Sequence, residues 1–178
     1  EDAKKYLKHK YTKENYISIL SNQANNYSYL KKYSESIKMS DEVINSCNTS
    51  STFDLNAKGL AYYTKGYICV QTGDSLGIHY LKKSEEFHIK SNNINALGIT
   101  YYYIARLYKK LNNYDKVIYY SESALKNLKL NQQNAITTLN LLAQAYHYKK
   151  DSNKAINILV NALKDTTISK RNRLFLQN

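Results

Sequence analysis

The stretch YYYIARLYKKLNNYDKVIYYSESAL, residues 101–125, decides the predicted fold. Two segments with helical apolar periodicity flank a Leu-Asn-Asn turn signal. The small residue Ala105 is followed three positions later by Tyr108, and twelve and nineteen positions later by Val117 and Ala124. Antiparallel helices approach closely only where side chains are small, and a ring from the next turn fills the space beside them. The stretch therefore predicts a tight helical hairpin in which these residues have structural roles.

The same spacing recurs along the chain. The small residue and its partner three positions later are Ala24/Tyr27, Gly66/Cys69, Ala105/Tyr108 and Ala143/Tyr146. The residues twelve and nineteen positions after each small residue are Ser36/Val43, Ile78/Glu85, Val117/Ala124 and Ala155/Ala162. The second unit departs most, because Glu85 places a charge where a small residue is expected. Successive units are separated by 42, 39 and 38 residues, a period typical of helical repeat arrays.

This pattern resembles the tetratricopeptide repeat (TPR), in which a small residue and an aromatic on the first helix face small residues on the second. The match is closest in the last two units, where Tyr101, Ile104, Leu139 and Leu142 also fit. The resemblance covers nearly the whole chain. It implies an all-α fold, a right-handed superhelical solenoid of antiparallel helix hairpins with about four TPR-like repeats. The repeats are longer than the usual 34 residues, and no proline ends their helices.

The predicted domain is a single array over residues 1–178. The first helices of the repeats are expected at about 14–30, 54–72, 94–111 and 132–149, and the second helices at about 33–47, 75–91, 114–130 and 152–165. Residues 1–12 are expected to end a preceding repeat, and residues 168–178 to start a further helix or a cap. The polar loop 45–54 is expected to link two repeats, with Ser51, Thr52 or Asp54 available as a helix N-cap.

Composition supports helices, since the chain has no proline and only five glycines. Cys47 and Cys69 match neither a zinc pattern nor a disulfide framework, so both are predicted to be packing residues. No apolar run is long enough for a membrane span, and the start is not a signal sequence. A cytoplasmic location is favoured, with the periplasm as the alternative. The missing initiator Met predicts a segment taken from a longer protein.

Catalytic patterns are absent from the sequence. His9, His79, His88 and His147 are scattered, and there is no HExxH, no nucleophile elbow and no glycine-rich phosphate loop. The adjacent pair Glu85-Glu86 would point about 100° apart on a helix, so the two carboxylates could not share a substrate. We therefore expect no enzyme activity, no cofactor and no metal.

The first helices of a hairpin solenoid line a concave groove, and helical offsets from the small residues select the side chains that point into it. These candidates for a peptide- or protein-binding groove are Asn22, Asn25, Tyr29, Tyr63, Tyr67, Gln71, Tyr102, Tyr103, Arg106, Lys110, Asn140, Gln144, His147 and Tyr148. Amides can donate to and accept from an extended peptide backbone, and tyrosine supplies stiff contact area. The alternative is that several of these tyrosines pack between repeats.

The resemblance implies a protein or peptide ligand, as in bacterial pheromone receptors and chaperone adaptors. The clamp that chaperone adaptors use for a terminal carboxylate is not expected, because only Asn25 matches it. The chain looks most similar to arrays attached to bacterial transcription regulators and sensor kinases, where an effector domain lies in the same full-length chain. A non-catalytic scaffold or sensor module is therefore the expected function.

Charge is uneven along the chain. Residues 101–178 carry 13 basic and 4 acidic residues, whereas residues 1–100 carry 13 and 10. The basic half could attract nucleic acid, an anionic membrane surface or an acidic partner through sequence-independent electrostatics, although no recognition motif of a nucleic-acid-binding module accompanies it. Solvated lysines near helix ends would produce the same excess. The second alternative to peptide binding is homo-oligomer formation through exposed terminal repeats.

Overall fold

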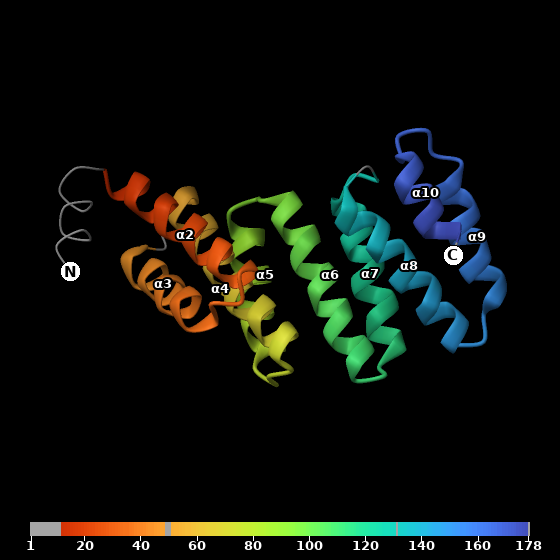
Figure 1. Ribbon diagram of the computed structural model, residues 1–178, viewed down its shortest axis with the longest axis horizontal. Helices are drawn as coiled ribbons and strands as arrows, with labels where there is room; N and C mark the ends of the chain where they lie inside the picture. Colours follow the sequence, from red (N-terminus) through yellow and green to blue (C-terminus); the bar gives the residue numbers. More distant parts are fainter. Residues whose placement is uncertain (1–11, 49–50, 131, 178) are drawn as a thin grey trace. The chain divides into compact units, whose positions relative to one another are not determined.

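The computed structural model describes residues 12–48, 51–130 and 132–177 (Figure 1). These residues form α-helices and turns and contain no β-strand, so the predicted all-α class is confirmed. The helices are α2 (Lys13–Tyr29), α3 (Tyr33–Ser46), α4 (Thr52–Thr72), α5 (Gly77–Lys90), α6 (Ile94–Lys110), α7 (Tyr114–Asn127), α8 (Gln133–Tyr148), α9 (Ser152–Leu163) and α10 (Lys170–Gln177).

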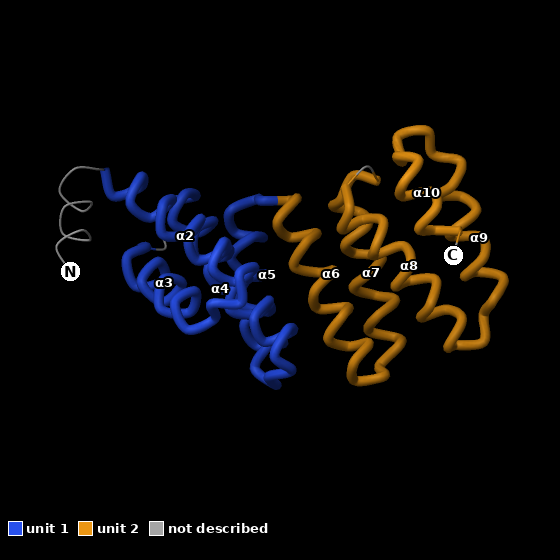
Figure 2. The backbone as a smooth tube through the Cα atoms, viewed as in Figure 1, with its two compact units in different colours: residues 1–93 blue, residues 94–178 orange. Residues whose placement is uncertain are grey.

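The chain forms two compact units, residues 1–93 and residues 94–178 (Figure 2). In the first unit α2 pairs with α3 and α4 pairs with α5, and α4 also packs against α2 and α3. In the second unit α6 pairs with α7 and α8 with α9, while α8 also contacts α6 and α7. Within each unit, successive hairpins thus stack in sequence order, as in an all-α helical-hairpin solenoid. A single array with a right-handed superhelical course stays a prediction.

The helix bounds lie close to those expected from apolar periodicity. The largest difference is at the end of α7, which stops at Asn127 because Leu128 has an extended backbone (φ −105°, ψ 140°). Ser51 is the N-cap of α4, and its hydroxyl accepts a hydrogen bond from the Asp54 N–H at 3.0 Å. The predicted start of a further helix over 168–178 corresponds to α10. The prediction for residues 1–12 lies almost entirely outside the described residues.

The same turn ends the first helix of all four hairpins. Each turn contains one residue with positive φ, and these residues are Lys31 (60°), Gly73 (81°), Asn112 (53°) and Lys150 (62°). The N–H of the following residue donates to the carbonyl of the pattern's tyrosine or cysteine, over 2.9–3.0 Å. These carbonyls are Tyr27, Cys69, Tyr108 and Tyr146. The turn satisfies carbonyls that the helix leaves unpaired, and the same turn also ends α5, where Asn92 has a φ of 53° and the Asn93 N–H donates to the His88 carbonyl at 3.0 Å.

The small residues of the pattern lie at the helix contacts. Ala24, Ala105 and Ala143 are all buried, and so are Val117 and Ala124 on α7. In the α2–α3 hairpin the Ser36 hydroxyl donates to the Ala24 carbonyl at 2.6 Å, which ties the two helices together at the anchor. The predicted structural role of these positions is therefore confirmed.

The predicted register of the second helix in the α4–α5 hairpin is wrong by one residue. The buried residues of α5 are Gly77, Leu81, Ser84 and His88, whereas Ile78 and Glu85 are only partly buried. The physical reason is a tight first turn, in which the Gly77 N–H donates to the Asp74 carbonyl at 3.2 Å, three residues back. Helix α5 thus begins four residues after the positive-φ residue Gly73, whereas the other three second helices begin two residues after theirs, and its buried face lies one position earlier.

Helix α10 is anchored to the end of α9 by one arginine. The Arg173 guanidinium donates to the carbonyls of Leu163 (2.5 Å), Asp165 (2.6 Å) and Ile168 (3.2 Å). Leu163 is the last residue of α9, so its carbonyl has no intrahelical partner, and the other two carbonyls belong to the link between α9 and α10. Leu176 of α10 is buried in a cluster with residues of α8 and α9. This anchoring holds α10 beside α8, where it contributes to the candidate site.

Candidate functional site

In the first unit, the predicted groove residues include a row of aromatic contacts. Tyr29 of α2 meets Tyr67 of α4 edge to face, with ring centroids 5.4 Å apart, and Tyr63 lies 6.4 Å from Tyr67. Tyr29 remains 55% exposed. The other predicted residues of this unit are Asn22 and Gln71, which are exposed, and Asn25, which is half-buried. The packing alternative for the tyrosines therefore describes Tyr63 and Tyr67, which are half-buried in this row.

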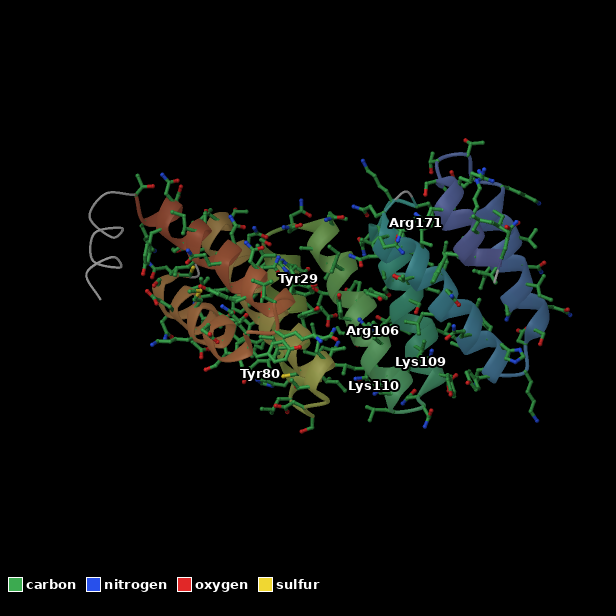
Figure 3. The ribbon with its side chains drawn as sticks, in the orientation of Figure 1. Tyr29, Tyr80, Arg106, Lys109, Lys110 and Arg171 are labelled. Atoms are coloured by element: carbon green, nitrogen blue, oxygen red, sulfur yellow. The ribbon has the colours of Figure 1, made fainter. Side chains whose placement is uncertain are left out.

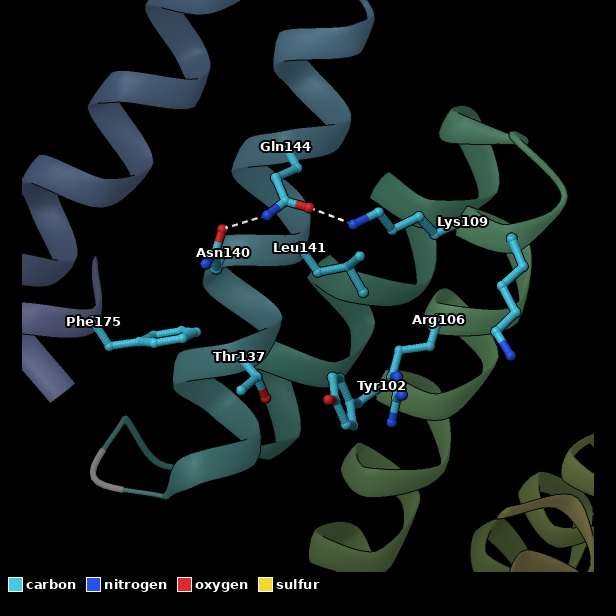
Figure 4. A pocket seen from close by; sticks show the side chains of 9 residues that line it. Tyr102, Arg106, Lys109, Thr137, Asn140, Leu141, Gln144 and Phe175 are labelled. Atoms are coloured by element: carbon cyan, nitrogen blue, oxygen red, sulfur yellow. Dashed lines mark hydrogen bonds between the residues drawn. The ribbon is translucent and has the colours of Figure 1, made fainter. Parts of the chain in front are cut away.

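In the second unit, five of the predicted residues line one cavity of about 420 Å³. They come from two helices, and they are Tyr102, Arg106 and Lys110 of α6 and Asn140 and Gln144 of α8. Figure 4 shows the α6 and α8 side chains facing each other across this cavity. The helical offset that selected these positions thus brings side chains from two predicted repeats to one place.

Among the described residues, Arg106 contacts two aromatic rings and forms no ion pair with a carboxylate. Its guanidinium carbon lies 5.7 Å from the Tyr102 ring centroid and 5.3 Å from that of Tyr103. The two rings meet edge to face at 4.9 Å. Both tyrosines are buried, with 9% and 8% of their surface exposed. Tyr102 thus lines the cavity and supports Arg106, while Tyr103 has a packing role, as the alternative reading of the tyrosines predicts.

The α8 side of the cavity carries a short chain of hydrogen bonds. The Lys109 ammonium donates to the Gln144 side-chain oxygen at 2.5 Å, and the Gln144 amide donates to the Asn140 side-chain oxygen at 2.9 Å (Figure 4). This chain links α6 to α8 and holds both amides in position. Because the Asn140 oxygen accepts from Gln144, its NH₂ group is directed to donate.

A second hollow of about 540 Å³ adjoins the first, since both are lined by Asn140, Gln144 and Phe175. His147 and Tyr148, the last predicted groove residues, line this second hollow together with apolar residues of α9 and α10. Tyr148 also stacks on Tyr114 of α7, with centroids 4.7 Å apart. The two hollows together form a continuous feature along α8.

Four lining residues of the first cavity were not predicted: Lys109, Thr137, Leu141 and Phe175. Lys109 could have been found, because it lies three positions after Arg106 and therefore on the same helix face. Phe175 could not, since its place depends on how α10 docks. The cavity wall is strongly basic, with Arg106, Lys109 and Lys110 and no Asp or Glu among its lining residues.

Buried reactive groups elsewhere in the described chain have packing roles. Cys47 and Cys69 are free and buried, as predicted for packing residues. Burial raises the pKa of both thiols, that of Cys47 to about 11, which keeps them protonated and unreactive. Within residues 12–48, 51–130 and 132–177, no group of three His, Cys, Asp or Glu side chains could hold a metal ion. In the same ranges, no helix has the length and apolar character needed to cross a membrane.

Comparison of the chain with protein-family models, with curated proteins and with solved structures gave no match.

Proposed function

We propose that this chain is a non-catalytic binding module that holds an extended peptide or protein segment on the α6–α8 face of its second unit. The observation that carries the proposal is the convergence of Tyr102, Arg106, Asn140 and Gln144 on one cavity. These side chains combine a ring, a guanidinium and two amides. They can recognise a peptide by its backbone and by its side chains, while apolar walls bury part of it.

The shape and chemistry of the two adjoining hollows support an extended occupant. They run along α8 and change from polar residues near Arg106 to apolar residues near Leu159 and Leu176. An extended segment places successive side chains in different surroundings, so it can use both hollows at once. Nothing in the cavity supports covalent or acid–base catalysis, because it contains no nucleophile paired with a base.

The test is selection from a library of random peptides by the immobilised chain. The double variant Asn140→Ala/Gln144→Ala removes both amides and should lose at least tenfold in affinity for the selected peptides, a change of about 1.4 kcal/mol. The matched control is Asn157→Ala/Asn161→Ala, which removes two exposed amides from α9, outside both hollows. Equal binding to wild type and both variants would exclude the α6–α8 face. The buried Tyr102 and Tyr103 are unsuitable targets, because their loss would also disturb packing.

We also propose that the hairpins are TPR-like and form the regulatory part of a larger bacterial signalling or transcription-regulating protein. The support is the recurrence of the small-residue pattern together with the same turn at the end of each first helix. The sequence that flanks this segment in its gene provides the test. A kinase or helix-turn-helix domain there would support the proposal, whereas a catalytic domain unrelated to signalling would contradict it.

A further inference from the structure

We propose that the second unit binds an anionic phospholipid membrane through the edge that carries the turns between its paired helices. This loop edge consists of residues 110–116, around the α6–α7 turn, and residues 148–154, around the α8–α9 turn. Both turns lie at the lower end of the unit in Figure 1, and Figure 3 labels Lys110 at the end of α6 that leads into the edge. Lys110 and Tyr148 also line the hollows described above, but membrane binding does not depend on the proposed peptide site.

Side-chain contacts join the two turns into one surface. The Tyr114 ring stacks on the Tyr148 ring, with centroids 4.7 Å apart and planes inclined by 13°. The Lys149 ammonium lies 2.7 Å from the Asp115 carboxylate. A hollow of about 460 Å³ is lined by residues 111–115 of one turn and by Lys149 of the other. A flat partner that meets one turn can therefore meet the other as well.

The loop edge has an excess of positive charge. It contains five lysines and two aspartates, a net charge of +3. Asp115 pairs with Lys149, and Asp151 pairs with Lys154 at 3.2 Å, so both carboxylates are already engaged with cations of the same edge. Lysines close to an anionic leaflet are attracted by its negative surface potential. The edge is therefore complementary in charge to such a leaflet.

Exposed apolar groups accompany these cations. Leu111 is 62% exposed and Tyr148 is 59% exposed. Leu111 stands between Lys110 and Asn112, whose positive φ of 53° forms the turn. Solvated lysines at helix ends explain the charge, but they do not explain a leucine and a tyrosine in the same surface. At a membrane, leucine can enter the acyl region, tyrosine rings favour the headgroup level, and long lysine side chains reach the phosphates.

The chemistry of the loop edge fits a membrane better than a nucleic acid. All of its basic residues are lysines, which act as point charges, whereas arginine binds a phosphate through two parallel N–H groups. Proteins that bind single strands offer ring faces to the bases, but the Tyr114 and Tyr148 rings stack on each other. An exposed leucine gains by entering lipid, and it adds little to a contact with phosphates.

The experiment is co-sedimentation of the 178-residue chain with lipid vesicles. One set is made of phosphatidylcholine alone, and in the other about one-third of the lipid is phosphatidylglycerol. We expect binding to the anionic vesicles to be at least about tenfold stronger, and the difference should shrink as salt is raised.

One pair of variants tests the charges. Lys116→Gln/Lys150→Gln removes two exposed cations of the loop edge and should weaken binding to anionic vesicles by at least about tenfold. The matched control, Lys126→Gln/Lys129→Gln, removes two exposed cations at and just beyond the other end of α7, and it should weaken binding by less than about threefold. Unchanged helical circular dichroism would show that both variants fold. Equal losses would assign the binding to the overall charge of the unit and overturn the inference.

A second pair tests insertion. Leu111→Asn should weaken binding to anionic vesicles by at least about fivefold, because an amide does not enter the acyl region. The control Ile94→Asn changes a residue that is 49% exposed at the opposite end of α6, and it should change binding by less than about twofold. Full binding by Leu111→Asn would contradict an inserted loop edge.

Two further results would overturn the inference. The first is a failure to bind anionic vesicles at low salt, which leaves the peptide site unaffected because peptide selection is carried out without lipid. The second is a fluorescent oligothymidylate that displaces the vesicles and whose binding is lost in Lys116→Gln/Lys150→Gln, which would identify the partner of the loop edge as nucleic acid.

Discussion

The hairpins α4–α5 and α6–α7 each place a glycine of the first helix against a large side chain near the end of the second. A Cβ atom on Gly59 would lie 2.6 Å from the His88 ring, and one on Gly98 would lie 2.8 Å from Cγ of Leu128. Both glycines come seven positions before the small anchor of their repeat. The two hairpins thus share one steric arrangement but fill it with side chains of opposite polarity.

The difference lies in what each side chain leaves unpaired. Leu128 has no polar atom, whereas neither ring nitrogen of His88 has a hydrogen-bond partner among the described residues. His88 is 1% exposed, and burial lowers its pKa to about 4. A buried polar group without a partner costs about 1–3 kcal/mol. This position therefore requires a large side chain and tolerates a polar one at a cost in stability.

The α2–α3 hairpin supports this interpretation, because there the large side chain comes from the first helix and the small one from the end of the second. At the equivalent positions it has Ile17 on the first helix and Cys47 on the second, and both belong to one buried cluster. A large side chain from either helix therefore fills the space, provided that the opposite residue is small.

Truncating the two large side chains should have the largest effect. Leu128→Ala leaves an apolar cavity and should reduce the opening free energy of α6–α7 by about 3 kcal/mol. His88→Ala should cost α4–α5 about half as much, because it also removes two unpaired nitrogens. Hydrogen exchange of peptides from each hairpin measures both losses. Leu111→Ala, at a position that is 62% exposed, is the control. Equal losses at the two hairpins would contradict the comparison.

Lowering the pH should weaken α4–α5 more than α6–α7. His88 has a folded pKa of about 4 against an ordinary value of 6.5, so the unfolded chain takes up its proton first as the pH falls. The hairpin therefore keeps its full stability above about pH 6.5 and loses about 3 kcal/mol between pH 6.5 and pH 4. Hydrogen exchange, corrected for its intrinsic pH dependence, measures the loss. His79→Gln, at an exposed histidine of the same helix, should preserve this dependence, and His88→Leu should remove it.

Replacing His88 by leucine should make the two hairpins alike. At neutral pH, His88→Leu should stabilise α4–α5 by about 1 to 2 kcal/mol, because a side chain of similar size replaces one with two unpaired nitrogens. Hydrogen exchange of the α4 and α5 peptides measures the gain. A loss of protection instead would show that the imidazole contributes an interaction that leucine cannot make.

The smallest effect should be the coupling between the glycine and its partner. Gly59→Ala should cost about 1 kcal/mol, since crowding against His88 outweighs the gain in helix propensity. In the double variant Gly59→Ala/His88→Ala the crowding is relieved. Its stability loss should therefore be smaller than the sum of the two single losses by about 0.5 to 1 kcal/mol. A double-mutant cycle on hydrogen-exchange free energies measures this term. Strict additivity would mean that the two residues do not share one space.

The sequence predicted most of the fold because its signals are local. The spacing of Ala105, Tyr108 and Val117 predicts a helix contact within one hairpin, so the residues that specify each hairpin lie within its own repeat. The helical offset from Ala105 and Ala143 also selected Arg106 and Gln144, which the structure brings to the same cavity. Both inferences depend only on helix geometry and on the order of the hairpins.

The register of α5 and the role of His88 could not be predicted in this way. A three-residue turn after Asp74 precedes α5, whose buried face lies one position earlier than predicted. No residue pattern in the sequence predicted this turn. Gly59 was a partial signal, because glycine in a helix interior is costly and indicates close approach of another group. Its partner lies 29 residues later and was not identifiable until the register was known.

By itself, the sequence determined that this chain forms helical hairpins with small residues at their contacts, because those features arise from interactions within about forty residues. Only the tertiary structure decided which side chains complete the contacts and the cavity. Lys109 reaches Gln144, Arg173 anchors α10, and Phe175 closes one wall, and each of these depends on how one helix is rotated and docked against another. Such rotations are settled by packing and hydrogen bonding across the unit, which no local spacing encodes.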